Sequence, residues 1–170
     1  FGAVSTTTAK AVEEEIGERL SEIDQILDGG QCLVGIESTI IDCTGEAPRI
    51  LRPGAITEEM VESSTRLQLR ERVDLIRVSG ALEKHYSPEA KVFTEGDVEI
   101  GDGFLALANI PTPVGVIRLA SPNSVEEFAR ILYQSLRDAD AKGLTRVKVI
   151  NPLGPGLAAA IRDRVARASR

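Results

Sequence analysis

The stretch VGVIRLASPNSVEEFARILYQSL, residues 114–136, joins a strand pattern directly to the start of an amphipathic helix. Its first part, Val114 to Leu119, is an apolar run typical of a strand. Ser124-Val125-Glu126-Glu127 is a capping box, in which a serine and a glutamate three residues later cap the first helical turn. Apolar residues then recur on one helical stripe: Val125, Phe128, Ala129, Leu132 and Leu136.

The rest of the region from 91 to 170 repeats this alternation of apolar runs and helices. Strand-like runs occupy 91–94, 104–108 and 147–150, and a second amphipathic helix follows the last of them. That helix carries its apolar residues on one side: Leu157, Ile161, Val165 and Ala168. Apolar runs that alternate with amphipathic helices are typical of an open α/β sheet. We predict such a sheet for this region.

The region 1–64 contains shorter elements. We predict a helix after Ser5-Thr6-Thr7-Thr8 that ends at Gly17, and a second, short helix that Thr57 caps. Between the helices we predict extended segments joined by turns: a strand at 23–27, a turn at 28–30, and a hairpin of 33–43 with 49–51. Residues 65–90 alternate charged and apolar side chains without a clear period, which predicts a linker.

Composition and charge exclude several classes of protein. The chain is 42% hydrophobic and 27% charged, as in soluble globular proteins, and no apolar run approaches the roughly 20 residues that span a bilayer. The net charge of −6 gives no sign of direct nucleic-acid binding, which usually needs a basic excess. Four arginines crowd the C-terminus, where a helix end favours cations, and an RNA-binding patch is the alternative: Arg162, Arg164, Arg167 and Arg170.

Two cysteines and one histidine are too few for a structural zinc site. Cys32 and Cys43 lie in apolar, strand-like segments. We therefore expect them to be reduced, buried thiols that act as small hydrophobic side chains. No metal ligand is predicted.

Ser38 and Arg52 are the polar residues of the predicted hairpin that stand out. Ser38 lies on the same strand face as Ile36 and Ile40, where its hydroxyl can donate to a phosphate or carboxylate oxygen or bond within the sheet. Arg52 precedes Pro53, which favours an extended end of the strand. A guanidinium there suits bidentate phosphate contacts, and a solvated surface arginine is the alternative.

Two further positions have a ligand-binding and a structural interpretation. Ser5 stands just before a predicted helix, where free backbone N–H groups bind anions, or it acts as a plain N-cap. His85 and Tyr86 lie in the predicted linker beside Pro88. Histidine can donate to a phosphate and tyrosine can stack on a nucleobase, or both can pack against their neighbours.

Four motifs in order carry a resemblance that covers the whole chain. They are FGAVSTTTA at 1–9, LDGG with VGIESTIID over 27–42, ILRPGAIT at 50–57, and the Ser79-Gly80 and His85-Tyr86-Ser87-Pro88 pairings. These motifs resemble the YrdC/Sua-type threonylcarbamoyl-AMP synthase family, in its long form with an additional C-terminal domain. One departure is Thr6, where the family often has proline.

The resemblance implies an α/β architecture in three parts. Residues 1–64 are expected to be the C-terminal portion of a YrdC-like twisted-sheet catalytic domain, 65–90 a linker, and 91–170 a small Rossmann-like α/β domain. The family's K-x-R phosphate-binding motif and S-x-N segment are expected upstream of this chain, so no catalytic residue is assigned. Residues expected to bind ATP are Ser5, Arg52, His85 and Tyr86. Ser38 and Thr39 are expected to bind threonine.

The resemblance also implies an activity. The family condenses L-threonine, bicarbonate and ATP into threonylcarbamoyl-AMP and pyrophosphate for tRNA modification, with Mg²⁺ expected to bridge the phosphates. A cytoplasmic enzyme is expected, whose product passes to a tRNA-modifying transferase complex, and the isolated chain is expected to be inactive. The alternative is a nucleotide- or RNA-binding module of the same fold without synthase activity.

Overall fold

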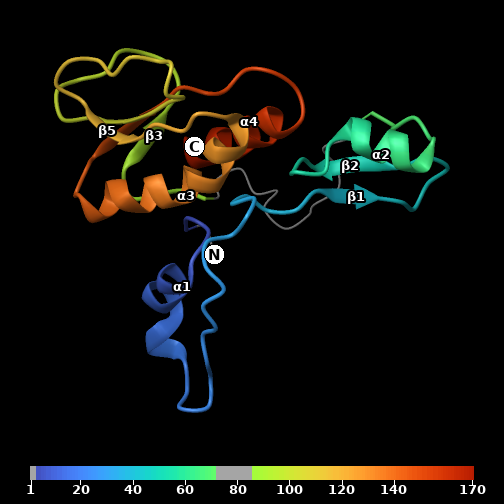
Figure 1. Cartoon of the computed structure of the whole chain (residues 1–170), viewed down its shortest axis with the longest axis horizontal. Coiled ribbons are helices and arrows are strands. Elements are labelled where there is room, and N and C mark those ends of the chain that lie inside the picture. Colours follow the sequence, from blue (N-terminus) through green and yellow to red (C-terminus); the bar gives the residue numbers. More distant parts are fainter. Residues whose placement is uncertain (1–2, 72–85) are drawn as a thin grey trace.

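A computed structural model describes residues 3–71 and 86–170, and its elements lie in three groups (Figure 1). The first group is α1 (Ala9–Ile16) with the short 3₁₀ helix η1 (Gly17–Arg19). The second is the pair β1 (Ile40–Asp42) and β2 (Arg49–Arg52) with α2 (Glu58–Thr65). The third comprises β3 (Lys91–Phe93), β4 (Gly103–Leu105), β5 (Ile117–Ala120), α3 (Val125–Ala141), β6 (Arg146–Val149) and α4 (Leu157–Ala168).

The elements of the third group lie within residues 91–170, the region predicted from the sequence to be the C-terminal domain, and this region keeps that name below. Its four strands are parallel and lie in the order β3-β6-β4-β5. A crossover through α3 connects β5 to β6, as parallel strands require. The open α/β sheet predicted for this region is confirmed, and each predicted strand is present with its bounds shifted by a few residues.

The core of this domain lies between the sheet and the two long helices. The apolar stripe predicted for α3 is buried, with Phe128 and Leu132 fully enclosed. Ile161 of α4 and Val147 of β6 are buried in the same core. Val4 and Tyr86, which lie outside the domain in sequence, also belong to this core. The domain therefore packs against the N-terminal segment and against the end of the linker.

The capping box at the start of α3 forms with one change of partner. The Ser124 hydroxyl accepts from the Glu127 amide at 3.1 Å, as predicted. The Glu127 carboxylate accepts from the backbone amide of Asn123, at 2.7 Å, in place of the Ser124 amide. The first turn is thus capped from two residues, which fixes where the helix begins.

Replacing Ser124 by alanine should lower the free energy of unfolding by about 1 kcal/mol, because the first turn of α3 loses an acceptor for a free N–H group. Urea denaturation of the variant measures this change. Ser121→Ala is the matched control, since Ser121 is exposed and precedes the cap. The control should stay within about 0.5 kcal/mol of the parent. Equal losses in the two variants would contradict the cap.

The N-terminal elements agree with prediction only in part. Thr8 caps α1, Gly17 ends it, and Thr57 caps α2. The predicted hairpin is present as the antiparallel pair β1 and β2, although only the last residues of 33–43 are strand. The described chain contains no helix that is long and apolar enough to cross a membrane.

Two predictions for this region are wrong. Residues 23–27 are not a strand: Ile23 and Leu27 are almost fully exposed. A strand needs a neighbour to take its backbone hydrogen bonds, and no strand of the described residues pairs with this segment. The two cysteines are free but exposed. Cys32 lies in an irregular segment, and Cys43 directly follows β1 at the start of the hairpin loop, so neither side chain enters a core.

Candidate functional site

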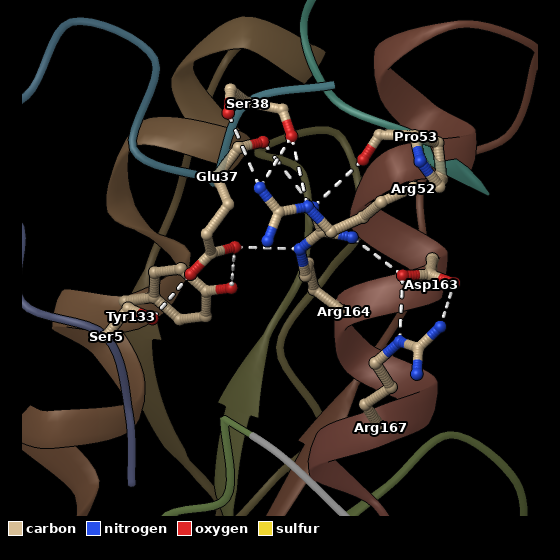
Figure 2. Close-up of polar contacts among 9 residues, drawn as sticks. All are labelled: Ser5, Glu37, Ser38, Arg52, Pro53, Tyr133, Asp163, Arg164 and Arg167. Carbon is tan, nitrogen blue, oxygen red and sulfur yellow. Dashed lines mark hydrogen bonds and ion pairs between the residues drawn. The ribbon is translucent and has the colours of Figure 1, made fainter. Parts of the chain in front are cut away.

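Glu37 is the centre of a cluster of polar contacts between distant parts of the chain (Figure 2). One carboxylate oxygen accepts from the Ser5 hydroxyl at 2.5 Å. The other accepts from the Tyr133 hydroxyl at 2.7 Å and from Nε of Arg164 at 2.8 Å. These donors come from the N-terminal segment, α3 and α4. Glu37 therefore connects segment 34–42 to both long helices of the C-terminal domain, α3 and α4.

Two glycines allow the backbone around Glu37 to pack closely on both sides. Gly35 has a positive φ of 78°, and a Cβ there would lie 2.4 Å from Cα of Arg130 in α3. Gly54, just after β2, also has no space for a side chain. A Cβ there would lie 2.4 Å from the Thr39 amide nitrogen and 2.8 Å from the Glu37 carbonyl oxygen. Segment 35–39 thus lies in direct backbone contact with α3 and with the end of the hairpin.

A polar face of α3 binds the N-terminal segments. Arg130 donates to the Leu33 carbonyl at 3.0 Å, and Arg137 donates to the Val4 carbonyl at 2.5 Å. Together with Tyr133, these residues recur at helical spacing on one side of α3. The same helix therefore packs its apolar stripe on the sheet and donates hydrogen bonds to Val4, Leu33 and Glu37 from a second face.

Ser38 and Arg52, the two residues predicted from the hairpin, are in contact. Nε and one terminal nitrogen of Arg52 donate to the Ser38 carbonyl, at 3.1 and 2.8 Å. A bulge in the hairpin pairs Ile40 with Arg52 and Ile41 with Ile50, which leaves Leu51 unmatched and directs Arg52 toward Ser38.

The burial of Arg52 and the exposure of Ser38 test the structural alternatives to their ligand-binding roles. Arg52 is buried, with 7% of its surface exposed, which excludes a solvated surface arginine, whereas Ser38 is exposed. The hydroxyl of Thr39 donates to the Ile56 carbonyl at 2.7 Å and so connects β1 to the approach of α2. The binding roles of all three residues stay predictions.

Tyr86 lies inside the core of the C-terminal domain. Only 1% of its surface is exposed, and its ring lies 5.5 Å from the Tyr133 ring and 5.5 Å from the guanidinium carbon of Arg164. Its φ of 63° is unusual for a residue with a side chain. The ring therefore packs against its neighbours here, and its contact with ATP stays a prediction. His85, Ser79 and Gly80 lie outside the described residues.

Arg164 fits neither interpretation of the C-terminal arginines, as cations at a helix end or as an RNA-binding patch. Its side chain is fully buried, and besides Glu37 it contacts Asp163 at 2.7 Å and the Pro53 carbonyl at 2.9 Å. Position 164 falls on the same helix face as Ile161 and Val165, so helical periodicity already places it inward. A charged side chain on an apolar helix face is buried only when its hydrogen-bond donors have acceptors.

Sequence reasoning missed three members of this cluster: Glu37, Tyr133 and Arg164. The signal for Glu37 is a carboxylate within an otherwise apolar and small-residue run, 34–41. The signal for Arg164 is its place on the apolar face of α4. Neither signal names a partner, because Glu37 and Arg164 are 127 residues apart in the chain.

The contacts of Glu37 determine its charge. Burial by itself raises the pKa of this carboxyl, but the hydrogen bonds from Ser5, Arg164 and Tyr133 outweigh burial and leave the pKa below its ordinary value of 4.5. Burial, together with the negative charge of Glu37, raises the pKa of the Tyr133 hydroxyl far above its usual range. Glu37 is therefore a carboxylate and Tyr133 a neutral donor at neutral pH.

The lowered pKa of Glu37 predicts a pH dependence of stability. Because the folded pKa lies below 4.5, ionised Glu37 stabilises the folded state fully above that pH. This contribution is lost as the pH falls from 4.5 through the folded pKa. Urea denaturation between pH 3 and 7 of the protein and of Glu37→Gln tests this. The difference in unfolding free energy between them should shrink below pH 4.5, and a constant difference would contradict the prediction.

Two family models match the chain. The model for the C-terminal domain of threonylcarbamoyl-AMP synthase matches residues 56–170. The chain belongs to the threonylcarbamoyl-AMP synthase family. A second model, of the Sua5/yciO/yrdC type and described as telomere recombination, matches residues 1–54 of this family member. The family resemblance carried by the sequence motifs is confirmed.

Several curated relatives are named threonylcarbamoyl-AMP synthase. The protein from Pyrococcus abyssi is 31% identical over 189 residues, which cover 99% of this chain and 55% of the relative. The protein from Schizosaccharomyces pombe is 29% identical over 202 residues, which cover 97% of this chain and 49% of the relative. A Bacillus subtilis relative is 39% identical over 62 residues, 36% of this chain and 17% of that protein. The chain thus spans about half the length of the first two relatives.

Solved structures support the same fold. P. abyssi Sua5 complexed with L-threonine matches with a TM-score of 0.78 and 28% identity, over 99% of this chain and 55% of that chain. A P. abyssi Sua5 variant, with a histidine and the following tyrosine replaced by alanine, also gives a TM-score of 0.78, at 26% identity over 99% of this chain and 54% of that chain. These matches confirm the predicted α/β architecture of the family.

Proposed function

We propose that the complete protein carrying this chain is an L-threonylcarbamoyladenylate synthase. Its substrates are L-threonine, bicarbonate and ATP, and its products are threonylcarbamoyl-AMP, pyrophosphate and water. The observation that carries the proposal is the match to synthases over nearly the whole chain, together with the P. abyssi Sua5 structure, which contains L-threonine. The proposal divides the chain into a catalytic part (1–64), a linker (65–90) and the C-terminal domain (91–170), in a cytoplasmic enzyme.

The proposed reaction has two bond-forming steps. The threonine amine attacks the carbon of bicarbonate, a C–N bond forms, and water leaves, which gives a carbamate. A carbamate oxygen then attacks the α-phosphorus of ATP, and the bond to the bridging oxygen breaks so that pyrophosphate leaves. Neither step needs a covalent enzyme intermediate. Catalysis then depends on the alignment of the two substrates and on neutralisation of phosphate charge.

The polar residues drawn in Figure 2, which are called the polar cluster below, suggest which residues align the substrates and which neutralise phosphate charge. Ser38 is exposed beside the buried Arg52, so its hydroxyl is open to threonine or its carbamate, with Thr39 next to it. Arg52 would supply positive charge to the nucleotide phosphates. The Ser5 hydroxyl already donates its hydrogen bond to the Glu37 carboxylate. The Ser5 hydroxyl can therefore contact ATP only as an acceptor, which fits a donor such as a ribose hydroxyl or the adenine amino group.

His85 and Tyr86 are proposed to close the nucleotide end of the site. Tyr86 lies near Arg52 and Arg164, whose positive charges act on the pKa of its hydroxyl. Burial raises this pKa, the charge of Glu37 raises it further, and the two arginines lower it. The end of the linker is therefore next to the residue that we assign to the phosphates.

No described residue is assigned to Mg²⁺. The described residues contain no group of three or more histidine, cysteine, aspartate or glutamate side chains that could hold a metal ion. The two carboxylates of the polar cluster, Glu37 and Asp163, already accept from arginines. Mg²⁺ is accordingly proposed only as a partner of the ATP phosphates, and no step is assigned to it.

Incubation of the complete protein with L-threonine, ¹³C-bicarbonate and ATP tests the function. We expect a labelled threonylcarbamoyl-AMP by mass spectrometry and threonine-dependent release of pyrophosphate. ATP binding without this product would contradict the proposal and would favour the alternative, a nucleotide- or RNA-binding module of the same fold. The product is a diffusible adenylate, so we propose that a separate tRNA-modifying transferase complex consumes it.

A further inference from the structure

Arg164 is a buried charge that joins two separate segments of the chain. It lies in α4 and has no exposed surface, so neither solvent nor a bound substrate reaches its guanidinium. Its Nε donates to the Glu37 carboxylate at 2.8 Å, and a terminal nitrogen donates to the Pro53 carbonyl at 2.9 Å. Burying a guanidinium is costly unless its donors are satisfied in this way.

Two of the partners of Arg164, Glu37 and Pro53, are the chain neighbours of the two candidate substrate residues. Glu37 precedes Ser38, and Pro53 follows Arg52. Arg52 in turn donates to the Ser38 carbonyl at 2.8 Å. The result is a closed ring, drawn in Figure 2, in which Arg164 bonds to the residue before Ser38 and to the residue after Arg52.

The ring has little freedom to adjust. Tyr133 and Ser5 also donate to the Glu37 carboxylate, which fixes its orientation. On the hairpin side, the Gly54 backbone leaves no room for even a methyl group beside Thr39. A change in the contacts of Arg164 must therefore move segment 36–39 relative to the end of β2, or leave the partly buried Glu37 carboxylate with fewer donors.

We propose that Arg164 is a positioning residue through which the C-terminal domain sets the placement of Ser38 relative to Arg52. The domain thereby takes part in catalysis without touching substrate. This inference rests on the proposed function, in which Ser38 contacts threonine and Arg52 contacts ATP. A fault in the relative placement of two reactants lowers the rate of the chemical step more than the binding of either reactant.

The test is the steady-state kinetics of Arg164→Lys in the complete protein. Lysine keeps the charge, but its single ammonium cannot reproduce the fork that binds Glu37 and Pro53 together. We expect kcat to fall by about 10- to 100-fold, the effect of a small misplacement, while KM for ATP and for threonine changes by less than about threefold. An unchanged kcat, or a loss that lies wholly in KM, would overturn the proposal.

Arg162→Lys is the matched control. Arg162 belongs to the same helix and donates to the Pro152 carbonyl, within its own domain, at 2.9 Å. This hydrogen bond is to neither Glu37 nor Pro53, so the kcat of Arg162→Lys should equal that of the parent. The same kcat loss in both variants would show a general effect on α4 and overturn the positioning role. Should Arg164→Lys fail to fold, Tyr133→Phe removes a single donor to Glu37 and should lower kcat by about tenfold.

Hydrogen exchange separates this inference from the proposed function. In Arg164→Lys, amides of 36–39 and 50–56 should exchange faster than in the parent and in Arg162→Lys. If the parent makes no threonylcarbamoyl-AMP, the proposed function fails, and faster exchange confined to these two segments still supports the positioning role. Unchanged exchange in both segments would overturn that role whatever the activity.

Discussion

Replacing Arg52 by alanine in the complete protein should lower kcat/KM for ATP by about one to three orders of magnitude. The proposed synthase aligns a carbamate with the α-phosphate of ATP, and the guanidinium is the buried positive charge next to the exposed Ser38. Its removal also deletes the two hydrogen bonds to the Ser38 carbonyl. The variant therefore loses both charge neutralisation and the support of its neighbour.

Arg52→Lys separates these two losses. Lysine keeps a positive charge but cannot donate from two positions of a planar fork, so it should recover only part of the activity. Steady-state kinetics with ATP as the varied substrate, and pyrophosphate as the measured product, give both values. A lysine variant as slow as the alanine variant would mean that the fork matters more than the charge.

Arg49→Ala is the control for damage to the strand. Arg49 is on the same strand as Arg52, but it pairs with Asp42 at 2.6 Å near the turn of the hairpin. Its loss should reduce stability without changing kcat/KM for ATP. Unchanged kinetics in Arg52→Ala, or an equal loss in Arg49→Ala, would contradict the role assigned to Arg52.

The C-terminal domain could be predicted from sequence because its signals are local. The stripe of α3 and the face of α4 each repeat within a single helix, and the strands are short apolar runs between them. The strand predicted at 23–27 shows the limit of this reasoning. Its pattern is suitable for a strand, but strand formation depends on a neighbour that no local pattern supplies, and Ile23 is 90% exposed.

The candidate site could be predicted only in outline. The motifs located Ser38 and Arg52, and periodicity places Arg164 on the buried face of α4. The bond between Arg52 and Ser38 depends on a bulge in the hairpin, which alternation of side chains cannot reveal. The bond between Glu37 and Arg164 joins residues 127 positions apart, which only the assembled fold brings together.

Gly35→Ala should lower the free energy of unfolding more than any other alanine substitution considered for this chain. A Cβ at this position would lie 2.4 Å from Cα of Arg130 and 2.6 Å from the Ala129 carbonyl oxygen. Both are backbone atoms, so no side-chain rotation relieves the overlap. The positive φ of Gly35 adds backbone strain of about 1–2 kcal/mol for any residue with a side chain.

A glycine with the same backbone strain and open surroundings separates these two effects. Gly96 has a φ of 80°, against 78° for Gly35, and nothing lies within 4 Å of a Cβ built there. Gly96→Ala should therefore show the strain alone. Gly35→Ala should cost about 1–3 kcal/mol more, the usual cost of overpacking a filled site. Chemical denaturation of the parent and both variants measures the two differences.

The segments in which Gly35→Ala increases hydrogen exchange distinguish loss of the backbone contact between Gly35 and α3 from a general loss of stability. Gly35 is two residues before Glu37, so forcing it away from α3 must also draw the carboxylate away from Tyr133 and Arg164. Hydrogen exchange in Gly35→Ala should accordingly increase in 31–39 and at the polar face of α3, with the amides of the parallel sheet unchanged. Uniformly faster exchange throughout the C-terminal domain, or equal losses of stability in Gly35→Ala and Gly96→Ala, would show that the close backbone contact is not what joins segment 35–39 to the domain.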